Sequence, residues 1–352
     1  MLQAVKDICV LKTHWRCVPG CCATSEWYGG LDTMPGPGLP STREDEPVSR
    51  RALVLFVVMC VVWGIPYLLI KVAVSGMTPA SLVFLRTGIG ALLLVPVAIA
   101  RREVRPILPA WRWLIAYTVA ELAIPWFLLS SAETKLSSSL SGLLVAAVPL
   151  FGALLAWVTR SEHQLNGRRL AGLGVGFAGV AVLLGFDISG HDLLAVGEIG
   201  VCTVGYAVGP MIISRKLSHL PSVGVVAASL AFAALVYAPV GIIQLGDSHP
   251  TARVIASAVT LGVVCTALAF VLFFALIAEI GPVRATVITY FNPAVALVLG
   301  VTILSEPLRI GAVLGFALIL AGSYLATRRQ PAAAASVPEA REPVAAEAGP
   351  PS

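Results

Sequence analysis

The chain has 352 residues, of which 57% are hydrophobic and 12% charged, whereas a soluble domain carries roughly 25% charged residues. A soluble fold could not bury this much apolar surface, so the composition excludes a soluble globular protein and indicates a polytopic helical membrane protein. The net charge of +5 does not indicate a nucleic-acid partner, because the positive residues stand mainly in short connections between apolar runs.

Residues 1–49 contain no membrane-spanning run and no signal-peptide pattern. From Met34 the sequence is Pro/Gly-rich and then charged, which is typical of a disordered cytosolic segment. The residues before Met34 resemble neither a domain nor a leader, so we expect Met34 to be the natural start; a native product whose intact mass includes residues 1–33 would contradict this. The four cysteines in this segment lack partner ligands, so no metal or cofactor is expected.

Ten apolar runs follow, each long enough to cross a bilayer. They lie near 52–75, 79–100, 111–132, 136–158, 167–186, 193–214, 222–245, 253–279, 283–304 and 308–327. The tail after Arg329 is rich in Ala, Pro and Glu. The sequence therefore predicts an all-α integral membrane protein with four segments: a disordered cytosolic N-terminal segment 1–49, a first repeat 50–186 with spans one to five, a second repeat 187–329 with spans six to ten, and a disordered cytosolic tail 330–352.

One stretch of the chain occurs twice. Residues 149–167 read PLFGALLAWVTRSEHQLNG, and residues 293–311 read PAVALVLGVTILSEPLRIG. Their prolines, Ser-Glu pairs and closing glycines keep one spacing of 144 positions (Pro149 to Pro293). A repeat of about half the chain indicates a duplicated transporter bundle.

The positive residues predict the orientation. With a cytosolic N-terminus, fourteen Lys and Arg residues flank the inner ends of the spans, and only Lys135, Arg253 and Arg309 flank the outer ends. Both termini are then cytosolic. Because each half has five spans, the two halves have opposite orientations, and such inverted repeats hold substrate near the midplane.

These features together resemble the EamA family of the drug/metabolite transporter superfamily. The first span reads Trp63-Gly64-x-Pro66-x-x-x-x-Lys71; Pro79 opens the second span, Arg86 lies inside it, and the proline, Ser-Glu and glycine pattern follows in both halves. The resemblance covers residues 52–327 and implies a carrier in a bacterial-type inner membrane, usually an exporter of amino acids, other metabolites or drugs. The second half departs from the first, with Tyr206-Ala207 in place of Trp63-Gly64 and no cation at the positions of Lys71 and Arg86.

Two cations lie in the outer halves of their spans. Lys71 shares a helical face with Gly64 and Tyr67, and Arg86 lies one to two turns inside the second span. They could hold a substrate carboxylate. The alternatives are a salt bridge to a buried carboxylate, or a Lys71 side chain that reaches the membrane surface.

Glu121 lies close to the midplane of the third span, where an unpaired carboxylate is costly. Such a group suits proton binding and release in each transport cycle. A fixed pair with Lys71 or Arg86 is the structural alternative. Glu133 and Glu198 stand nearer the ends of their spans and could equally be interfacial residues, and Glu279 is expected to reach water.

The remaining site candidates are Trp63, Tyr67, Tyr206, Tyr290 and Asn292, polar or aromatic residues at membrane depth. Aromatic walls suit cationic and amphipathic substrates, although ordinary packing explains each residue singly. The Ser161-Glu162 and Ser305-Glu306 pairs are expected to cap the helices that follow them.

The sequence contains no Walker loop, HExxH motif or nucleophile elbow, so no enzyme activity is predicted and transport would use an existing gradient. The leading hypothesis is a multi-pass plasma-membrane exporter of small metabolites such as amino acids, working by alternating access with proton coupling. The alternatives are efflux of cationic or lipophilic drugs and, from other classes, an intramembrane enzyme acting on a lipid-linked substrate or a scaffold. The expected partners are a small-molecule substrate, the lipid bilayer and protons, with no nucleic acid; a homodimer stays open.

Overall fold

The computed structural model describes residues 49–159, 167–187 and 192–327, and all regular secondary structure in these ranges is helical. Within them, nine helical segments are long and apolar enough to cross a membrane, and Ile288–Ile303 is a shorter apolar helix. The prediction of an all-α membrane protein is therefore confirmed, and the shorter helix accounts for a tenth span. The expected disordered segments, the N-terminal cysteines and the Ser161-Glu162 pair lie outside the described residues.

The helices of the first half follow the predicted spans closely, and several spans are broken into shorter pieces. They are α2 (Arg50–Val62), α3 (Ile65–Ala73), α4 (Pro79–Ala100), η3 (Arg105–Ala110), α5 (Trp111–Tyr117), η4 (Thr118–Ala123), α6 (Ile124–Ala132), α7 (Ser138–Val145), α8 (Val148–Val158) and α9 (Gly167–Asp187). The third span begins six residues before the predicted 111, because a 3-10 turn, η3, leads into it.

The helices of the second half also follow the predicted spans. They are α10 (Leu193–Ile212), η6 (Ile213–Leu217), α11 (Ser222–Gly246), α12 (Ala252–Gly262), η7 (Val263–Leu268), α13 (Ala269–Ile280), α14 (Pro282–Ala285), α15 (Ile288–Ile303) and α16 (Ile310–Thr327). The predicted repeat boundary between residues 186 and 187 stays a prediction.

Proline explains two breaks in the first half. Pro66 has no N–H for the carbonyl of Val62, and the first span is interrupted between α2 and α3. Pro125 likewise leaves the carbonyl of Glu121 without its usual donor, and the turn before it is the π-helical η4. Both irregular turns lie deep inside their spans, where the surrounding helices enclose them.

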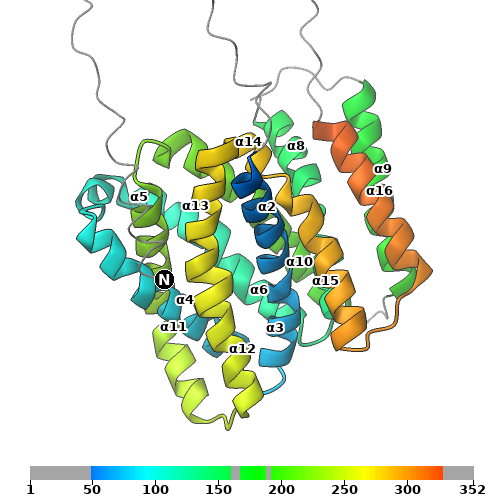
Figure 1. The fold of residues 1–352 in the computed structure, drawn as a ribbon. Helices are drawn as coiled ribbons and strands as arrows, with labels where there is room; N and C mark the ends of the chain where they lie inside the picture. Colours follow the sequence, from blue (N-terminus) through cyan, green and yellow to red (C-terminus); the bar gives the residue numbers. More distant parts are fainter. Residues whose placement is uncertain (1–48, 160–166, 188–191, 328–352) are drawn as a thin grey trace, which may run out of the picture. The chain divides into compact units, whose positions relative to one another are not determined.

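The packing repeats with the sequence. Span one packs on span eight (α2 on α13, α3 on α12), and its counterpart, span six, packs on span three (α10 on α6). Spans two and seven (α4, α11), four and nine (α7, α15), and five and ten (α9, α16) pair with each other. In Figure 1, α9 and α16 run side by side at the right of the bundle. Each half therefore contributes one member to every pair, as an inverted repeat requires.

The π-helical segments also repeat. The segment η7 occupies in the eighth span the place of η4 in the third, and Thr266 is its fourth residue as Glu121 is in η4. Similarly, Arg86 is the eighth residue of α4 and Ser229 the eighth residue of α11. The backbone is thus nearly symmetric, while the ionisable side chains on it are not.

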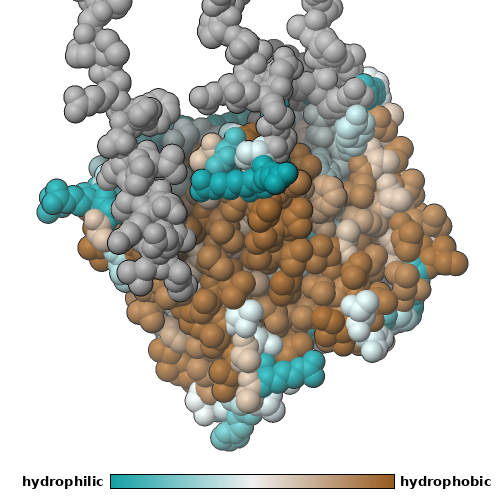
Figure 2. Space-filling view, viewed as in Figure 1, coloured by the Kyte–Doolittle hydropathy of each residue, from teal (hydrophilic) through white to brown (hydrophobic). Residues whose placement is uncertain are grey.

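Apolar side chains cover the outside of the bundle. Figure 2 shows a broad hydrophobic surface, with hydrophilic residues gathered toward its two ends. The two ends are named here by residues: α2 begins at the Arg50 end, and α3 finishes at the opposite, Lys71 end. Trp111 and Trp113 are exposed near the Arg50 end and lie close to cations, Trp113 with Lys216 Nζ 4.9 Å from its ring centroid. Tryptophans of this kind favour a membrane–water interface.

Candidate functional site

Polar side chains gather inside the bundle where α3, α4, α10, η4 and η7 approach one another. We call this group the polar core. Its members, which are close enough to interact electrostatically or by hydrogen bonds, are Tyr67, Arg86, Glu121, Glu133, Cys202, Tyr206, Cys265 and Thr266. They come from both halves of the chain, so the polar core spans the interface between the repeats.

Arg86 is the central cation of this group, with a side chain only 7% exposed. Its Nε donates to Thr266 Oγ1 at 2.9 Å, and its guanidinium carbon lies 3.6 Å from the centroid of the Trp126 ring. These two contacts fix the plane of the guanidinium. Among the described residues its two terminal nitrogens have no hydrogen-bond partner, so their N–H groups are available to bind an anion.

Two tyrosines and a thiol adjoin Arg86. Tyr67 and Tyr206 both lie near its guanidinium, and Tyr206 lies beside Cys202. Cys202 in turn interacts with both Glu121 and Glu133. The sequence patterns singled out neither Cys202 nor Thr266. The signal that could have found Thr266 is its match to Glu121 in the repeat, as the fourth residue of η7.

Glu121 lies on the π-helical turn η4, beside α10. Gly209 makes room for it, since a side-chain carbon at Gly209 would collide with the Glu121 carboxylate. Its Oε2 is enclosed and has no hydrogen-bond partner among the described residues. In those same ranges, no ion pair joins Glu121 to Lys71 or Arg86. Within the described residues, the fixed pair considered from the sequence is therefore not formed.

Lys71 has a different role from Arg86. Its ammonium donates to the backbone carbonyls of Glu133 at 2.6 Å and Leu136 at 2.7 Å, where the third span ends. A cation at a helix C-terminus satisfies carbonyls that have no intrahelical donor. The structure thus shows a half-buried Lys71 bound to backbone carbonyls, with no salt bridge to it among the described residues.

We therefore expect Lys71→Met to lower stability while leaving substrate affinity unchanged. The variant loses two charge-assisted hydrogen bonds, each worth about 1.5–3 kcal/mol. Thermal unfolding of the purified protein measures the loss. Lys135→Met is the matched control, because Lys135 is exposed on the same connection. Equal unfolding temperatures for the two variants would contradict the role assigned to Lys71.

Glu133 was expected to be an interfacial residue, and this is wrong. Its side chain is completely buried, and both carboxylate oxygens lack a hydrogen-bond partner among the described residues. Position near the end of a span suggested contact with water, but the side chain is enclosed, with Lys71 of α3 bound to the Glu133 carbonyl and the Glu306 carboxylate nearby.

Three sequence candidates lie outside the polar core. Trp63 packs at the break between α2 and α3 against Phe270 and Phe273, with ring centroids 6.0 Å and 4.7 Å away. The amide nitrogen of Asn292, oriented toward its neighbouring carbonyls, donates to Cys60 O and Ile288 O. Tyr290 meets Thr327 Oγ1 at 3.4 Å on the side of α16. All three residues lie toward the Arg50 end of the bundle.

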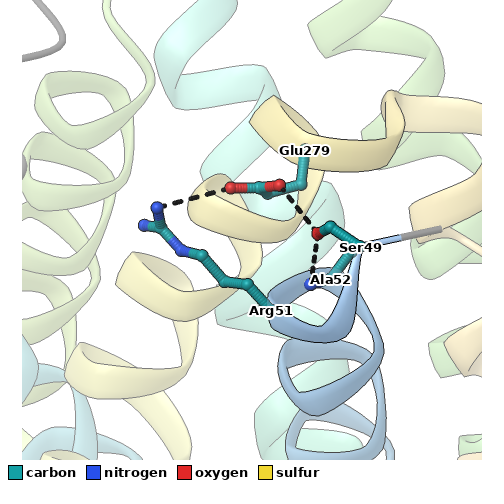
Figure 3. Close-up of polar contacts among 4 residues, drawn as sticks. All are labelled: Ser49, Arg51, Ala52 and Glu279. Atoms are coloured by element: carbon teal, nitrogen blue, oxygen red, sulfur yellow. Dashed lines mark hydrogen bonds and ion pairs between the residues drawn. The ribbon is translucent and has the colours of Figure 1, made fainter.

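Carboxylates tie helices together at both ends of the bundle. At the Arg50 end, Glu279 accepts from Ser49 Oγ at 3.2 Å and pairs with Arg51 at 3.4 Å (Figure 3). At the Lys71 end, Glu198 accepts from Ser131 Oγ at 2.9 Å. The Arg51 pair is half exposed to water and contributes little to stability.

Glu306 forms the strongest of these ties, and it corrects an expectation. It was expected to cap its own following helix, but its carboxylate instead accepts from the backbone N–H and the hydroxyl of both Ser138 and Ser139 at the start of α7. Gly300 leaves the necessary space, since a side chain there would collide with these groups. Glu306 therefore joins the two halves across the Lys71 end.

One pocket, of about 540 Å³, opens near the Arg50 end and is lined by Ile99, Arg102, Val104 and Arg105. These residues lie at the end of α4, at the start of η3 and in the connection between them. The pocket includes no member of the polar core, so we do not assign it to substrate.

Comparison with known proteins identifies the fold and its class. The model of the EamA-like transporter family matches residues 50–185 and again 197–328, which together cover most of the chain. The chain belongs to this family. The two matches are the two halves whose helices pair throughout the bundle, so this EamA transporter consists of two copies of the family unit.

The relatives of this transporter carry names of the same kind. An uncharacterized transporter, YvbV, of Bacillus subtilis is 27% identical over 303 residues, which cover 83% of this chain and 97% of YvbV. A probable amino-acid metabolite efflux pump of Salmonella typhimurium is 25% identical over 293 residues, covering 79% of this chain and 95% of the pump. A solved crystal structure matches with a TM-score of 0.57 at 23% identity, over 78% of this chain and 96% of that one, which supports the fold alone.

Family and relatives together establish a multi-pass membrane transporter and point away from an enzyme. They assign no role to single residues, so the polar core rests on its geometry.

Proposed function

We propose that this EamA transporter exports small metabolites that carry a carboxylate, amino acids among them, across the cytoplasmic membrane. The observation that carries the proposal is Arg86. A buried guanidinium costs several kcal/mol of desolvation unless an anion compensates it. Thr266 and Trp126 orient it without neutralising it, and two of its nitrogens have no partner in the described ranges. A planar fork of donors matches a carboxylate. The name of the Salmonella relative supports the same substrate class.

Alternating access follows from the inverted repeat. The helix pairs cross between the halves, so rocking one half against the other exposes the polar core to each side in turn. The carboxylate ties at the two ends, Glu279 at one and Glu306 at the other, are contacts that such a motion would break alternately. With the N-terminus cytosolic, the Lys71 end faces outward.

The proton gradient is the proposed energy source, with Glu121 as a coupling residue. One of its oxygens is enclosed without a partner, which favours the neutral carboxyl when the site is closed. Its other oxygen has no hydrogen-bond donor among the described residues, so a proton can be exchanged where water enters.

A second candidate is efflux of cationic or lipophilic compounds. It is favoured by Glu121 together with the aromatic rings of Trp63, Phe270 and Phe273, because carboxylates and aromatic faces attract organic cations. Flux into proteoliposomes with an imposed pH gradient, measured across amino acids, sugars and cationic dyes, separates the two. Movement of carboxylate-bearing solutes supports the proposal, and movement of dyes alone supports the alternative.

We expect Glu121→Gln to abolish accumulation driven by the pH gradient while retaining substrate exchange at equal pH. The amide occupies the same space beside Gly209 and cannot titrate. The measurement is gradient-driven uptake compared with counterflow of labelled substrate. Unchanged accumulation by the variant would remove Glu121 from the coupling mechanism.

A further inference from the structure

Glu133 is a second buried carboxyl group of the third span, separate from Glu121. It is the residue that follows α6, at the Lys71 end, and its side chain has no exposed surface. Neither of its carboxylate oxygens finds a hydrogen-bond donor among the described residues. A buried oxygen pair without donors is unfavourable for an ionised carboxylate, far more than for a neutral carboxyl.

The groups that face Glu133 do not neutralise it. Lys71 and Tyr67 approach from α3, Arg86 from α4, Cys202 from α10, and Glu306 from the connection between α15 and α16. Within the described residues, neither Lys71 nor Arg86 comes within ion-pairing distance of the carboxylate. Lys71 instead binds the Glu133 backbone carbonyl, and Glu306 adds a negative charge nearby. This closed packing therefore accommodates the protonated acid.

The other carboxylates at the same end provide a contrast. Glu306 accepts from two backbone N–H groups and two hydroxyls, and Glu198 accepts from Ser131. Both are only partly buried, so they keep the donors or water that an ionised carboxylate needs. Of these three groups, only Glu133 must give up its charge when the helices at this end pack together.

We propose that Glu133 is a proton-binding site of the transport cycle: it is protonated when the Lys71 end closes and gives its proton to water when that end opens. Opening separates α3, α6 and α7, which admits water to the carboxyl group and stabilises its ionised form. The pH on the side that the Lys71 end faces then controls closure, independently of Glu121.

This inference rests on the proposed transport function, and two measurements distinguish their failures. Full-length protein in liposomes is assayed for counterflow of labelled substrate at equal pH and for accumulation under a gradient of one pH unit. One proton per substrate supports about tenfold accumulation across such a gradient. If the wild-type protein shows no counterflow with any carboxylate solute, the proposed function fails before Glu133 is tested.

We expect Glu133→Gln, which mimics the protonated acid, to retain counterflow and to lose accumulation although Glu121 is intact. Counterflow by the wild type should decline as pH rises, whereas the variant should show no such decline. Glu198→Gln is the matched control at the same end and should behave like the wild type. Full accumulation by Glu133→Gln overturns the proposal, and so does loss of counterflow in folded variant protein.

If Glu133→Gln does not fold, Glu133→Asp provides the test of the proposal. The shorter acid still titrates from a different position, so the pH at which counterflow declines should shift relative to the wild type. An unshifted profile overturns the proposal.

Discussion

Arg86→Ala should weaken binding of carboxylate substrates at least about 100-fold. A buried bidentate contact makes two hydrogen bonds between charged groups, and each contributes roughly 1.5–3 kcal/mol. The guanidinium is the cation that the fold leaves with unused donors inside the polar core. Trp126 and Thr266 hold it in place and would not replace it. Binding is measured by the substrate concentration that protects the protein against thermal unfolding.

The selectivity of binding separates this role from a structural one. Wild-type protein should prefer an amino acid over its methyl ester, which lacks the carboxylate, and Arg86→Ala should bind both equally weakly. Arg86→Lys keeps the positive charge but lacks the planar pair of N–H donors. Its affinity for the acid should therefore fall between those of the wild type and Arg86→Ala. Thr266→Val removes only the Nε contact and should cost less than Arg86→Lys. A preserved preference for the acid in Arg86→Ala would place the carboxylate site elsewhere.

Gly322→Leu should produce the largest loss of stability of any substitution considered, with a fall in unfolding temperature of about 5–10 °C. Spans five and ten pack backbone to backbone. A side chain at Gly322 would collide with the main chain of Gly176 and with the carbonyl of Gly172. Backbone cannot move aside as a flexible side chain can, so α9 and α16 would have to separate.

Gly174→Leu is the control for this experiment. Gly174 lies on α9 between the contact glycines, but it is exposed, and nothing lies within 4 Å of a side-chain carbon built there. The Gly174→Leu variant should therefore unfold at the same temperature as the wild type. A similar loss for both variants would mean that the close approach of the two helices is not the reason.

Five glycines of α9 stand at positions 167, 172, 174, 176 and 179, and small residues at such positions predict close helix approach. The structure confirms this for Gly172, Gly176 and Gly179, whose added side chains would meet neighbouring atoms, and not for Gly167 and Gly174, which face open space. The spacing of glycines showed that α9 has a contact face. Which glycines belong to that face depends on where α16 lies.

The candidate site was predictable in part for a similar reason. Glu121 and Arg86 were identified from the sequence because ionisable groups inside apolar runs are costly anywhere in a membrane. Glu133 was misjudged because it follows the last residue of its helix, where the sequence alone suggests water. Only the tertiary structure shows that water is excluded, because the side chain is fully buried, with Lys71 of α3 bound to its backbone carbonyl and the Glu306 carboxylate nearby.

The sequence by itself determined the membrane class, the ten spans and the duplication, because the length of an apolar run and the repeat of a motif are properties of neighbouring residues and of one fixed offset. Tertiary structure alone decided the partner of each charged group. Lys71 meets carbonyls more than 60 positions away, and Glu306 meets serines 167 and 168 positions away. Such pairings depend on which helices lie side by side. In a membrane, many faces of an apolar helix can pack against another helix, so only the assembled bundle selects which faces meet.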